Sequence, residues 1–391
     1  MLGRDEQRPP GACREAVGDA PEEGAGDGAP AALATANESS VSTAAGSPLA
    51  RAELNLVASA LTRHDCEVAL PTVLITGGHG GIGLGCSKYL ASTYRANLVL
   101  AGRSLERVRP VADELSAAHD VNVSVLELDT SSMASVRSAA TRCRAMLADG
   151  EIESLDAIVC NAGVRLNGPV SYNADGYEST FATNYLGHFL LVELLLDCVA
   201  EHGRVVFTAS GTHDPDTADG RMMGVAADHD AIALANTGKD GSKAISSGKR
   251  YATSKLCMIL GAYELDRRVR RSGSSVASIA YDPGATSGTG FLREMPKPVQ
   301  WLAASAPMNW VMKRTGITIG SVDFSGTAMA MLAVDPAYAA SSGKYFQSHN
   351  GELIARRSSE LSYDQARQRK LWDDSKTLVG LKAVEEPAAL R

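Results

Sequence analysis

From residue 69 onward, short runs of apolar and β-branched residues alternate with longer amphipathic stretches. Several short runs, such as 72–76 and 155–160, are apolar at nearly every position, which is typical of parallel strands buried on both faces. Parallel strands separated by helices require right-handed crossovers. The pattern therefore predicts an α/β fold: a single Rossmann-type, doubly wound parallel sheet with helices on both faces.

The alternation also predicts where the elements lie. Strands are expected at 72–76, 97–102, 121–128, 155–160, 203–209, 275–281 and 343–347. Helices are expected at 81–94, 104–118, 132–148, 174–201, 249–271 and 326–334. Ahead of the first strand, residues 51–70 are predicted to form a short helix and a linker, because Leu54, Val57 and Leu61 share one helical face.

Composition divides the chain further. Residues 1–50 hold eight acidic and three basic residues, a net charge of -5 out of a total of -7, and few large apolar side chains. Such a segment cannot bury enough surface to offset its ordering entropy, which predicts a disordered acidic Ala/Gly-rich tail at 1–50. The nucleotide-binding domain is predicted at 71–381, with a flexible C-terminus at 382–391.

Several classes of protein and partner are excluded. The mild acidity gives no general attraction to nucleic acid, and no apolar run is long enough for a transmembrane helix. The seven cysteines are scattered without a CxxC pair, so neither a metal site nor a disulfide framework is expected. Residues 1–50 have no apolar signal-peptide core and are acidic, which favours a cytoplasmic location, with organelle targeting by this tail as the alternative.

A glycine-rich turn follows the first strand and opens the first helix. Glycines there let the backbone approach a pyrophosphate, and the helix N-terminus offers amide groups to the anion. Glycine is also common in turns that bind no ligand, because it adopts positive φ easily. The interpretation as a phosphate-binding turn therefore depends on the location of these glycines between a strand and a helix. The candidate cofactor-binding residues in this turn are Thr76, Gly77, His79, Gly81, Ile82 and Gly83.

Arg103 comes directly after the second strand. An acidic residue at this place would bind the ribose 2′-hydroxyl of NAD, whereas a cation suits the 2′-phosphate of NADP. Arg103 therefore predicts NADP(H) as the cofactor, against the alternative of a solvated arginine that opens a helix. Gly80, the residue before Gly81, adds no second cation.

Tyr251 and Lys255 are four residues apart, which places them on one face of a helix. A tyrosine with an ordinary pKa near 10 is a poor base at neutral pH. A neighbouring cation favours the phenolate, so the spacing predicts a pKa of Tyr251 lowered toward the working range. By itself this spacing is common by chance.

Together with the glycine-rich turn, the pair carries a resemblance to a known family. Across about residues 70–380 the chain resembles the short-chain dehydrogenase/reductase family. The motifs that carry the resemblance, in chain order, are TGGHGGIG at 76–83, Asp129 after the third strand, Asn161-Ala162-Gly163 after the fourth, Asn184 in TNYLGHFLL, Ser210 at the end of GRVVFTAS, Tyr251 with Lys255, and Asp282-Pro283-Gly284 after the sixth strand.

The resemblance implies roles for these residues. The catalytic set would be Asn184, Ser210, Tyr251 and Lys255. Asn184 would hold a water molecule, Ser210 would hydrogen-bond the substrate oxygen, and Tyr251 would be the general acid. Lys255 would lower the pKa of the tyrosine and bind the nicotinamide ribose. Asp129 would contact the adenine. The remaining cofactor contacts would come from Asn161, Ala162, Gly163, Pro283 and Gly284. Structural alternatives stay open for Asn184 as a helix pin, Ser210 as a turn residue and Asp129 as a helix cap.

Two departures from the family pattern concern loops. Ser210 and Tyr251 are 41 positions apart, so residues 211–248 form an inserted loop that is expected to be polar and glycine-rich. The threonine expected to bind the carboxamide after Gly284 is displaced, which leaves Thr286 and Thr289 as candidates.

The GHFLL segment, the long segment before Tyr251 and the long C-terminal part resemble the branch of the family that contains retinol dehydrogenases and light-dependent protochlorophyllide reductases. Ala285, however, occupies the place of a functionally important cysteine of those reductases, and Gly163 replaces their usual alanine. Residues 285–325 are predicted to form a helical substrate lid, whose tryptophans and methionines favour a small apolar ketone, aldehyde or alcohol as substrate. The same patch could instead pack as core, form a homo-oligomer contact, or touch a membrane surface.

The sequence thus predicts an NADPH-dependent oxidoreductase that transfers a hydride between the nicotinamide and an apolar carbonyl compound, or the corresponding alcohol. Two alternatives remain: a light-dependent protochlorophyllide-type reductase, and a non-catalytic NADP(H)-binding sensor or scaffold. Degenerate catalytic positions would mark the last of these, and none is seen in the motifs.

Overall fold

A computed structural model describes residues 70–226, 230–239, 241, 243–286 and 319–390. The expected tail at 1–50, the helix expected within 51–70 and most of the expected lid lie outside these residues, as does Thr289. Among the described helices, none is long and apolar enough to cross a membrane.

The described residues form an eight-stranded sheet in the order β10-β9-β6-β5-β4-β1-β2-β3. Every neighbouring pair is parallel except β9 and β10, which are antiparallel. The strands are β1(Thr72–Thr76), β2(Asn97–Gly102), β3(Val123–Glu127), β4(Ala157–Cys160), β5(Arg204–Thr208), β6(Ala277–Asp282), β9(Tyr345–His349) and β10(Glu352–Arg356). The expected doubly wound parallel sheet is confirmed, with β10 as an edge strand that the alternation did not predict.

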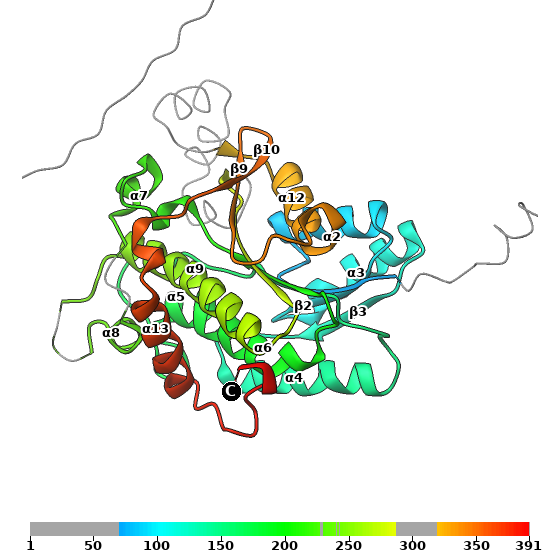
Figure 1. Cartoon of the computed structure of the whole chain (residues 1–391), viewed down its shortest axis with the longest axis horizontal. Coiled ribbons are helices and arrows are strands. Elements are labelled where there is room, and N and C mark those ends of the chain that lie inside the picture. The colour runs from blue at the N-terminus through cyan, green and yellow to red at the C-terminus, as the bar shows by residue number, and fades with distance from the viewer. Residues whose placement is uncertain (1–69, 227–229, 240, 242, 287–318, 391) are drawn as a thin grey trace, which may run out of the picture. The chain divides into compact units, whose positions relative to one another are not determined.

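Helices cover both faces of the sheet (Figure 1). One layer contains α2(Gly81–Thr93), α3(Leu105–His119) and α12(Val322–Val334). The other contains α4(Met133–Ala148), α6(Gly187–Leu195) and α9(Ser247–Arg271), with α13(Gln365–Leu378) packed against α9. Successive strand residues point to opposite faces of the sheet. Leu74 belongs to the core under α4, α6 and α9, whereas Val73 and Ile75 belong to the core under α2 and α12.

Two expected loops differ from the structure. Residues 322–325, which were assigned to the lid, are the first turn of α12, because Ser321 caps the helix by accepting from the Phe324 amide at 3.1 Å. A small two-stranded sheet of β7(Ala285–Thr286) and β8(Ile319–Gly320) stands before it. The described part of the expected lid is thus a strand pair and the first turn of α12.

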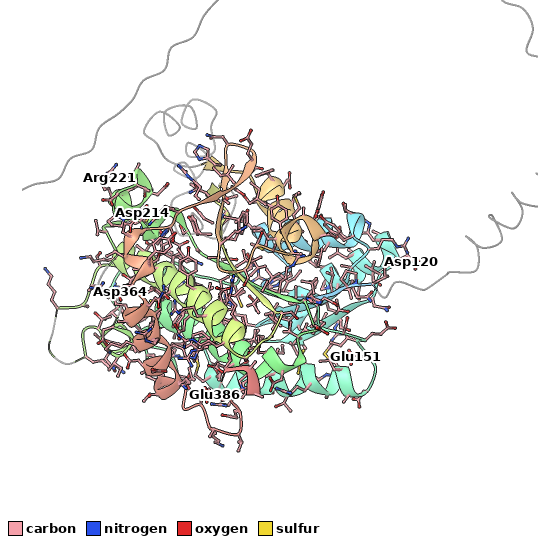
Figure 2. The ribbon with its side chains drawn as sticks, in the orientation of Figure 1. Asp120, Glu151, Asp214, Arg221, Asp364 and Glu386 are labelled. Atoms are coloured by element: carbon pink, nitrogen blue, oxygen red, sulfur yellow. The ribbon has the colours of Figure 1, made fainter. Side chains whose placement is uncertain are left out.

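The segment between Ser210 and Tyr251 is also more ordered than a polar loop. It contains η3(Gly211–His213), α7(Ala218–Met223) and α8(Ala231–Ala235). Met223, Leu234 and Ala235 are buried and join the core under α9. Figure 2 labels two residues of this segment: Asp214, which precedes α7, and Arg221, which lies on it. Apolar side chains spaced along a glycine-rich stretch let it fold back onto the domain.

Candidate functional site

The glycine-rich turn between β1 and α2 has the geometry of an anion cradle. Gly77 and Gly81 have φ of 69° and 53°, which favour glycine. A Cβ on Gly83 would lie 2.4 Å from the Gly77 carbonyl oxygen, so only glycine fits there. The N-cap of α2 is Gly80, which supplies no side-chain acceptor, and a Cβ there would meet nothing within 4 Å. Gly81 and Ile82 are the first residues of α2, so their amide groups have no acceptor within the helix and are available to an anion such as a pyrophosphate.

The Thr76 side chain joins this turn to the end of β4. Its hydroxyl oxygen accepts from the Asn161 and Ala162 amides, both at 2.9 Å, and lies 2.9 Å from His188 Nε2. His188 Nδ1 donates to the Asn184 carbonyl oxygen at 2.9 Å, so Nε2 accepts the Thr76 proton. Burial lowers the pKa of His188 to about 4, which keeps this neutral tautomer. Thr76 is expected to bind the cofactor, but its hydroxyl is buried and connects β1 to the residues after β4 and to His188.

His79 and two arginines gather beside the turn. A Cβ on Gly102 would lie 2.7 Å from His79 Cε1, so the imidazole lies against the end of β2. Burial lowers the pKa of His79, and the charges of Arg107 and Arg103 lower it further. Sequence reasoning missed Arg107, although its place one turn of α3 after Arg103 was a usable signal.

Asp129 follows β3 at the same edge of the sheet. Its Oδ1 accepts from the Ser131 amide at 2.9 Å and from the Ser131 hydroxyl at 2.7 Å. The α4 helix is capped by Ser132 instead, which accepts from the Ser135 amide. Asp129 therefore shapes the turn after β3 and is not the helix cap.

Asn184 lies in a π-helix, η1(Ala182–Leu186), at the start of α6. Its Oδ1 accepts from the Val164 amide at 2.7 Å, and its Nδ2 donates to the Val164 carbonyl at 3.0 Å and to Ser254 Oγ at 2.9 Å. A Cβ on Gly163 would lie 3.3 Å from Asn184 Oδ1 and 3.5 Å from Lys255 Nζ. Gly163, Asn184 and Lys255 thus meet, and the Asn184 side chain pins the loop after β4 to α9. Single-turn π-helices of this kind often occur at functional sites.

Ser210, Tyr251 and Lys255 also come together. Lys255 Nζ donates to the Thr208 carbonyl at 2.8 Å and lies 5.8 Å from the centre of the Tyr251 ring. Burial lowers the pKa of Lys255 to about 8. Burial also raises the pKa of Tyr251 to about 12, against a smaller lowering by its hydrogen bond with Ser210.

The pKa of Tyr251 therefore moves opposite to the sequence expectation. Desolvation penalises a phenolate more than the surrounding charges favour it. A neutral phenol is the form that can donate a proton, so this direction suits a general acid.

The Asp282-Pro283-Gly284 turn closes the site after β6. Gly284 has φ of 72°, and its amide donates to Asp282 Oδ1 at 2.9 Å. Thr286 is buried, and its hydroxyl donates to the Gly284 carbonyl at 3.1 Å. The candidate threonine thus lies beside the turn that the sequence expected to flank the nicotinamide.

Sequence reasoning missed several groups that hold the catalytic residues in place. His213 Nδ1 donates to the Ser210 carbonyl at 2.6 Å, and its Nε2 accepts from the Ser359 amide at 3.0 Å. Arg250, next to Tyr251, forms a buried ion pair with Glu178. The contacts of His213 with Ser359 and of Arg250 with Glu178 join positions far apart in the chain, so no local pattern marked them.

The chain is similar in sequence to proteins of one family. A family profile described as short chain dehydrogenase matches residues 71–218. Protochlorophyllide reductase A from Oryza sativa subsp. japonica is 31% identical over 325 residues, covering 79% of this chain and 80% of the relative. Polyprenol dehydrogenase from Danio rerio is 32% identical over 319 residues, covering 79% of this chain and 86% of the relative.

Solved structures share the fold. An uncharacterised protein from Mycobacterium paratuberculosis has a TM-score of 0.58 at 25% identity, with 80% of this chain and 94% of that chain covered. A short chain dehydrogenase from Burkholderia cenocepacia in complex with NADP has a TM-score of 0.53 at 21% identity, with 73% and 98% covered. With two relatives above 30% identity over most of its length, the chain belongs to the short-chain dehydrogenase/reductase family of oxidoreductases.

Proposed function

We propose that this protein is an NADPH-dependent oxidoreductase that reduces an apolar ketone or aldehyde, or oxidises the corresponding alcohol, with Tyr251 as the general acid or base. The observation that carries the proposal is the meeting of Asn184, Ser210, Tyr251 and Lys255. They come from η1, from the end of β5 and from α9, next to the glycine-rich turn.

The residues present fit NADP(H). The first-turn amide groups of Gly81 and Ile82 suit its pyrophosphate, and the Arg103, Arg107 and His79 cluster suits its 2′-phosphate. The Nδ1 atom of His79 is buried and has no hydrogen-bond partner among the described residues, which leaves a polar atom for a ligand there. Solved structures with this fold include complexes with NADP and with NADPH, which supports the same cofactor. When bound, the cofactor supplies or accepts the hydride.

The chain's own residues would move the proton. Ser210 would donate a hydrogen bond to the substrate oxygen, and Tyr251 would transfer its phenol proton to that oxygen as charge develops on it. A pKa of about 12 keeps Tyr251 protonated at neutral pH. Lys255, protonated below its pKa of about 8, would then stabilise the tyrosinate. In alcohol oxidation the same proton would pass to Tyr251.

An apolar substrate is supported by the composition of residues 285–325 and by the name of the polyprenol dehydrogenase relative. An NADPH-consumption screen over apolar ketones, aldehydes, retinoids and steroids tests the proposal. Oxidation of NADPH with one of these classes and formation of the alcohol is the expected result. Binding of NADPH with no turnover of any of them would instead favour the non-catalytic sensor.

Replacement of Arg103 by alanine should weaken NADPH binding far more than NADH binding. One charge-assisted hydrogen bond to the 2′-phosphate contributes about 1.5–3 kcal/mol, so the Kd for NADPH should rise roughly 10- to 100-fold. Titration of both cofactors by nicotinamide fluorescence measures this, with Arg109→Ala, on the α3 helix that follows Arg103, as the control. Equal losses for the two cofactors would show that Arg103 does not select NADP(H).

A second candidate function is light-dependent pigment reduction, because several relatives at about 30% identity are named protochlorophyllide reductases. Gly163 and Ala285 depart from the pattern of those enzymes. We expect equal NADPH oxidation in dark and illuminated assays with the apolar carbonyl substrates. Turnover of a protochlorophyllide-type pigment that occurs only under illumination would reverse this choice.

The proposed location is the cytoplasm, with organelle targeting by residues 1–50 as the alternative. The names of the plant relatives place those proteins in the chloroplast, which favours a direct test of the alternative. Fluorescent fusions of residues 1–391 and 51–391, imaged in plastid-containing cells, distinguish these two locations. Cytosolic signal from both fusions supports the cytoplasm. Plastid signal from the full chain alone supports targeting by residues 1–50.

A further inference from the structure

Asp282 is a buried carboxylate for which the proposed mechanism has no use. It is the last residue of β6, and only 1% of its surface is exposed. Its Oδ1 accepts from the Gly284 amide at 2.9 Å, and its Oδ2 accepts from Gln347 Nε2 at 2.7 Å and from the Tyr345 hydroxyl at 3.1 Å. All three donors are neutral, so they satisfy the oxygens without neutralising the charge.

The carboxylate lies next to the catalytic serine. A Cβ on Gly211, the residue after Ser210, would lie 3.1 Å from Asp282 Oδ2. Tyr281 pairs with Thr208 in the sheet, and the Thr208 carbonyl is the acceptor for Lys255 Nζ. Asp282 therefore stands one residue beyond the strand pair that holds the lysine.

Its charge acts on both members of the catalytic pair. Burial lowers the pKa of Lys255, and the charge of Asp282 opposes that change. The same charge adds to the effect of burial in raising the pKa of Tyr251. Both effects favour the protonated forms that carbonyl reduction requires.

We propose that Asp282 is a positioning residue that acts through its charge: it keeps Lys255 protonated and Tyr251 in the phenol form, and so sets the upper pH limit of catalysis. This inference rests on the proposed function, because it assigns Asp282 to the same proton-transfer site. It takes no part in contact with the substrate, since three protein donors occupy its oxygens.

Other charged and titratable groups face this region from each neighbouring element. His213 on η3 is neutral, because its Nδ1 donates to Ser210 and its Nε2 accepts from Ser359. Arg165, after β4, lowers the pKa of Tyr251, opposite to Asp282. Further groups among the described residues are His188 on α6, which interacts with Lys255, and Tyr281 on β6, which interacts with Asp282. Others are Asp214 before α7, Asp219 on α7, Tyr345 on β9, and Arg356 on β10, which donates to Gln347 Oε1 at 2.7 Å.

The test compares Asp282→Asn with the double variant Asp282→Asn/Gln347→Glu. In the single variant the new amide nitrogen faces the amide nitrogen of Gln347, so a hydrogen bond is lost together with the charge. The double variant restores a donor and an acceptor between these positions. It also moves the negative charge from position 282 to position 347, whose side chain accepts a hydrogen bond from Arg356. Hydrogen bonding and charge are thereby separated.

The pH profile of kcat/KM with NADPH is the first readout. In both variants the alkaline fall in activity should move to lower pH by about one unit, because the pKa values of Lys255 and Tyr251 both decrease. Recovery of the wild-type profile by the double variant would show that the carboxylate acts only through its hydrogen bonds, and would overturn the proposal. An unchanged profile in both variants would overturn it as well.

The second readout needs no turnover. The ordinary pKa of lysine is about 10.4, so between about pH 8 and 10 the unfolded chain binds a proton that folded Lys255 has lost. Unfolding free energy therefore contains a term that rises with pH in this window. The rise should begin about one unit lower in both variants. In a Lys255→Met background this difference should vanish; its persistence would show that Asp282 does not act through Lys255.

The two readouts also separate the inference from the proposed function. Absence of turnover in the wild-type enzyme would contradict the proposed function, while the stability curves would still report the action of Asp282 on Lys255. An unchanged onset of the stability rise would overturn the inference even in an active enzyme.

Discussion

Tyr251→Phe should lower the turnover of the carbonyl substrate by roughly 10²- to 10⁴-fold, the usual contribution of a positioned acid or base. The substitution removes only the hydroxyl, and the ring keeps its place on α9 beside Lys255. Because the glycine-rich turn and Arg103 are untouched, NADPH should bind within about twofold of the wild-type Kd. Steady-state kinetics and a fluorescence titration of NADPH measure the two quantities.

Tyr263→Phe is the matched control for this experiment. Tyr263 lies on the same helix three turns later, and its buried hydroxyl bonds Ser358 Oγ at 2.7 Å, away from the catalytic group. This variant loses one buried hydrogen bond, so it should lose about 1 kcal/mol of stability and retain turnover. Undiminished turnover in Tyr251→Phe would contradict the assigned role, and loss of NADPH binding there would indicate a structural defect.

Arg250→Met should lower the free energy of unfolding by about 3–5 kcal/mol, because it leaves the buried carboxylate of Glu178 without its cation. Arg250 Nε lies 3.1 Å from Glu178 Oε1, and both side chains are at most 3% exposed. Arg250 also donates to the carbonyls of Ile245 and Gly168, and so holds the segment before Tyr251 against the loop after β4. Glu178 in turn accepts from the Thr180 and Phe181 amides and caps α5(Ser179–Phe181).

A surface ion pair provides the comparison. Arg142 pairs with Glu151 on the outside of α4, where the side chains are 50% and 37% exposed. Arg142→Met should change the unfolding free energy by less than about 1 kcal/mol, because solvent screens the pair. Urea denaturation followed by circular dichroism gives both values. Similar losses in the two variants would show that the Arg250 pair is not the buried anchor described above.

The regular part of the fold was predictable because its signal is local. The bounds of β1 and β2 match the expectation, and the other central strands differ by one or two residues at their ends. Continuous apolar runs identify strands that helices cover on both faces, whatever the neighbouring strands are. The antiparallel β10 was not predicted because its apolar run has only three residues, Leu353 to Ala355, between the charged Glu352 and Arg356.

The site was predictable only as a set of residues. Motifs at the ends of successive parallel strands must gather at one edge of the sheet, so Gly77, Arg103, Asn161 and Ser210 could be grouped from their positions alone. The structural role of Asn184 was one of two alternatives, but its partner Val164, which lies after β4, could not be predicted. The contact between Thr76 and His188 was not predictable either, because the two residues are 112 positions apart.

The layered fold follows from the periodicity of the apolar residues, and the functional residues follow the ends of successive strands in the sequence. The pairing of Tyr251 with Lys255 follows from their spacing along one helix. Only the tertiary structure decided the protonation of that pair. Burial raises the pKa of Tyr251 and lowers that of Lys255, and Asp282 acts on both from another strand. Desolvation and field depend on every atom that surrounds a group in space, and no local pattern in a chain encodes them.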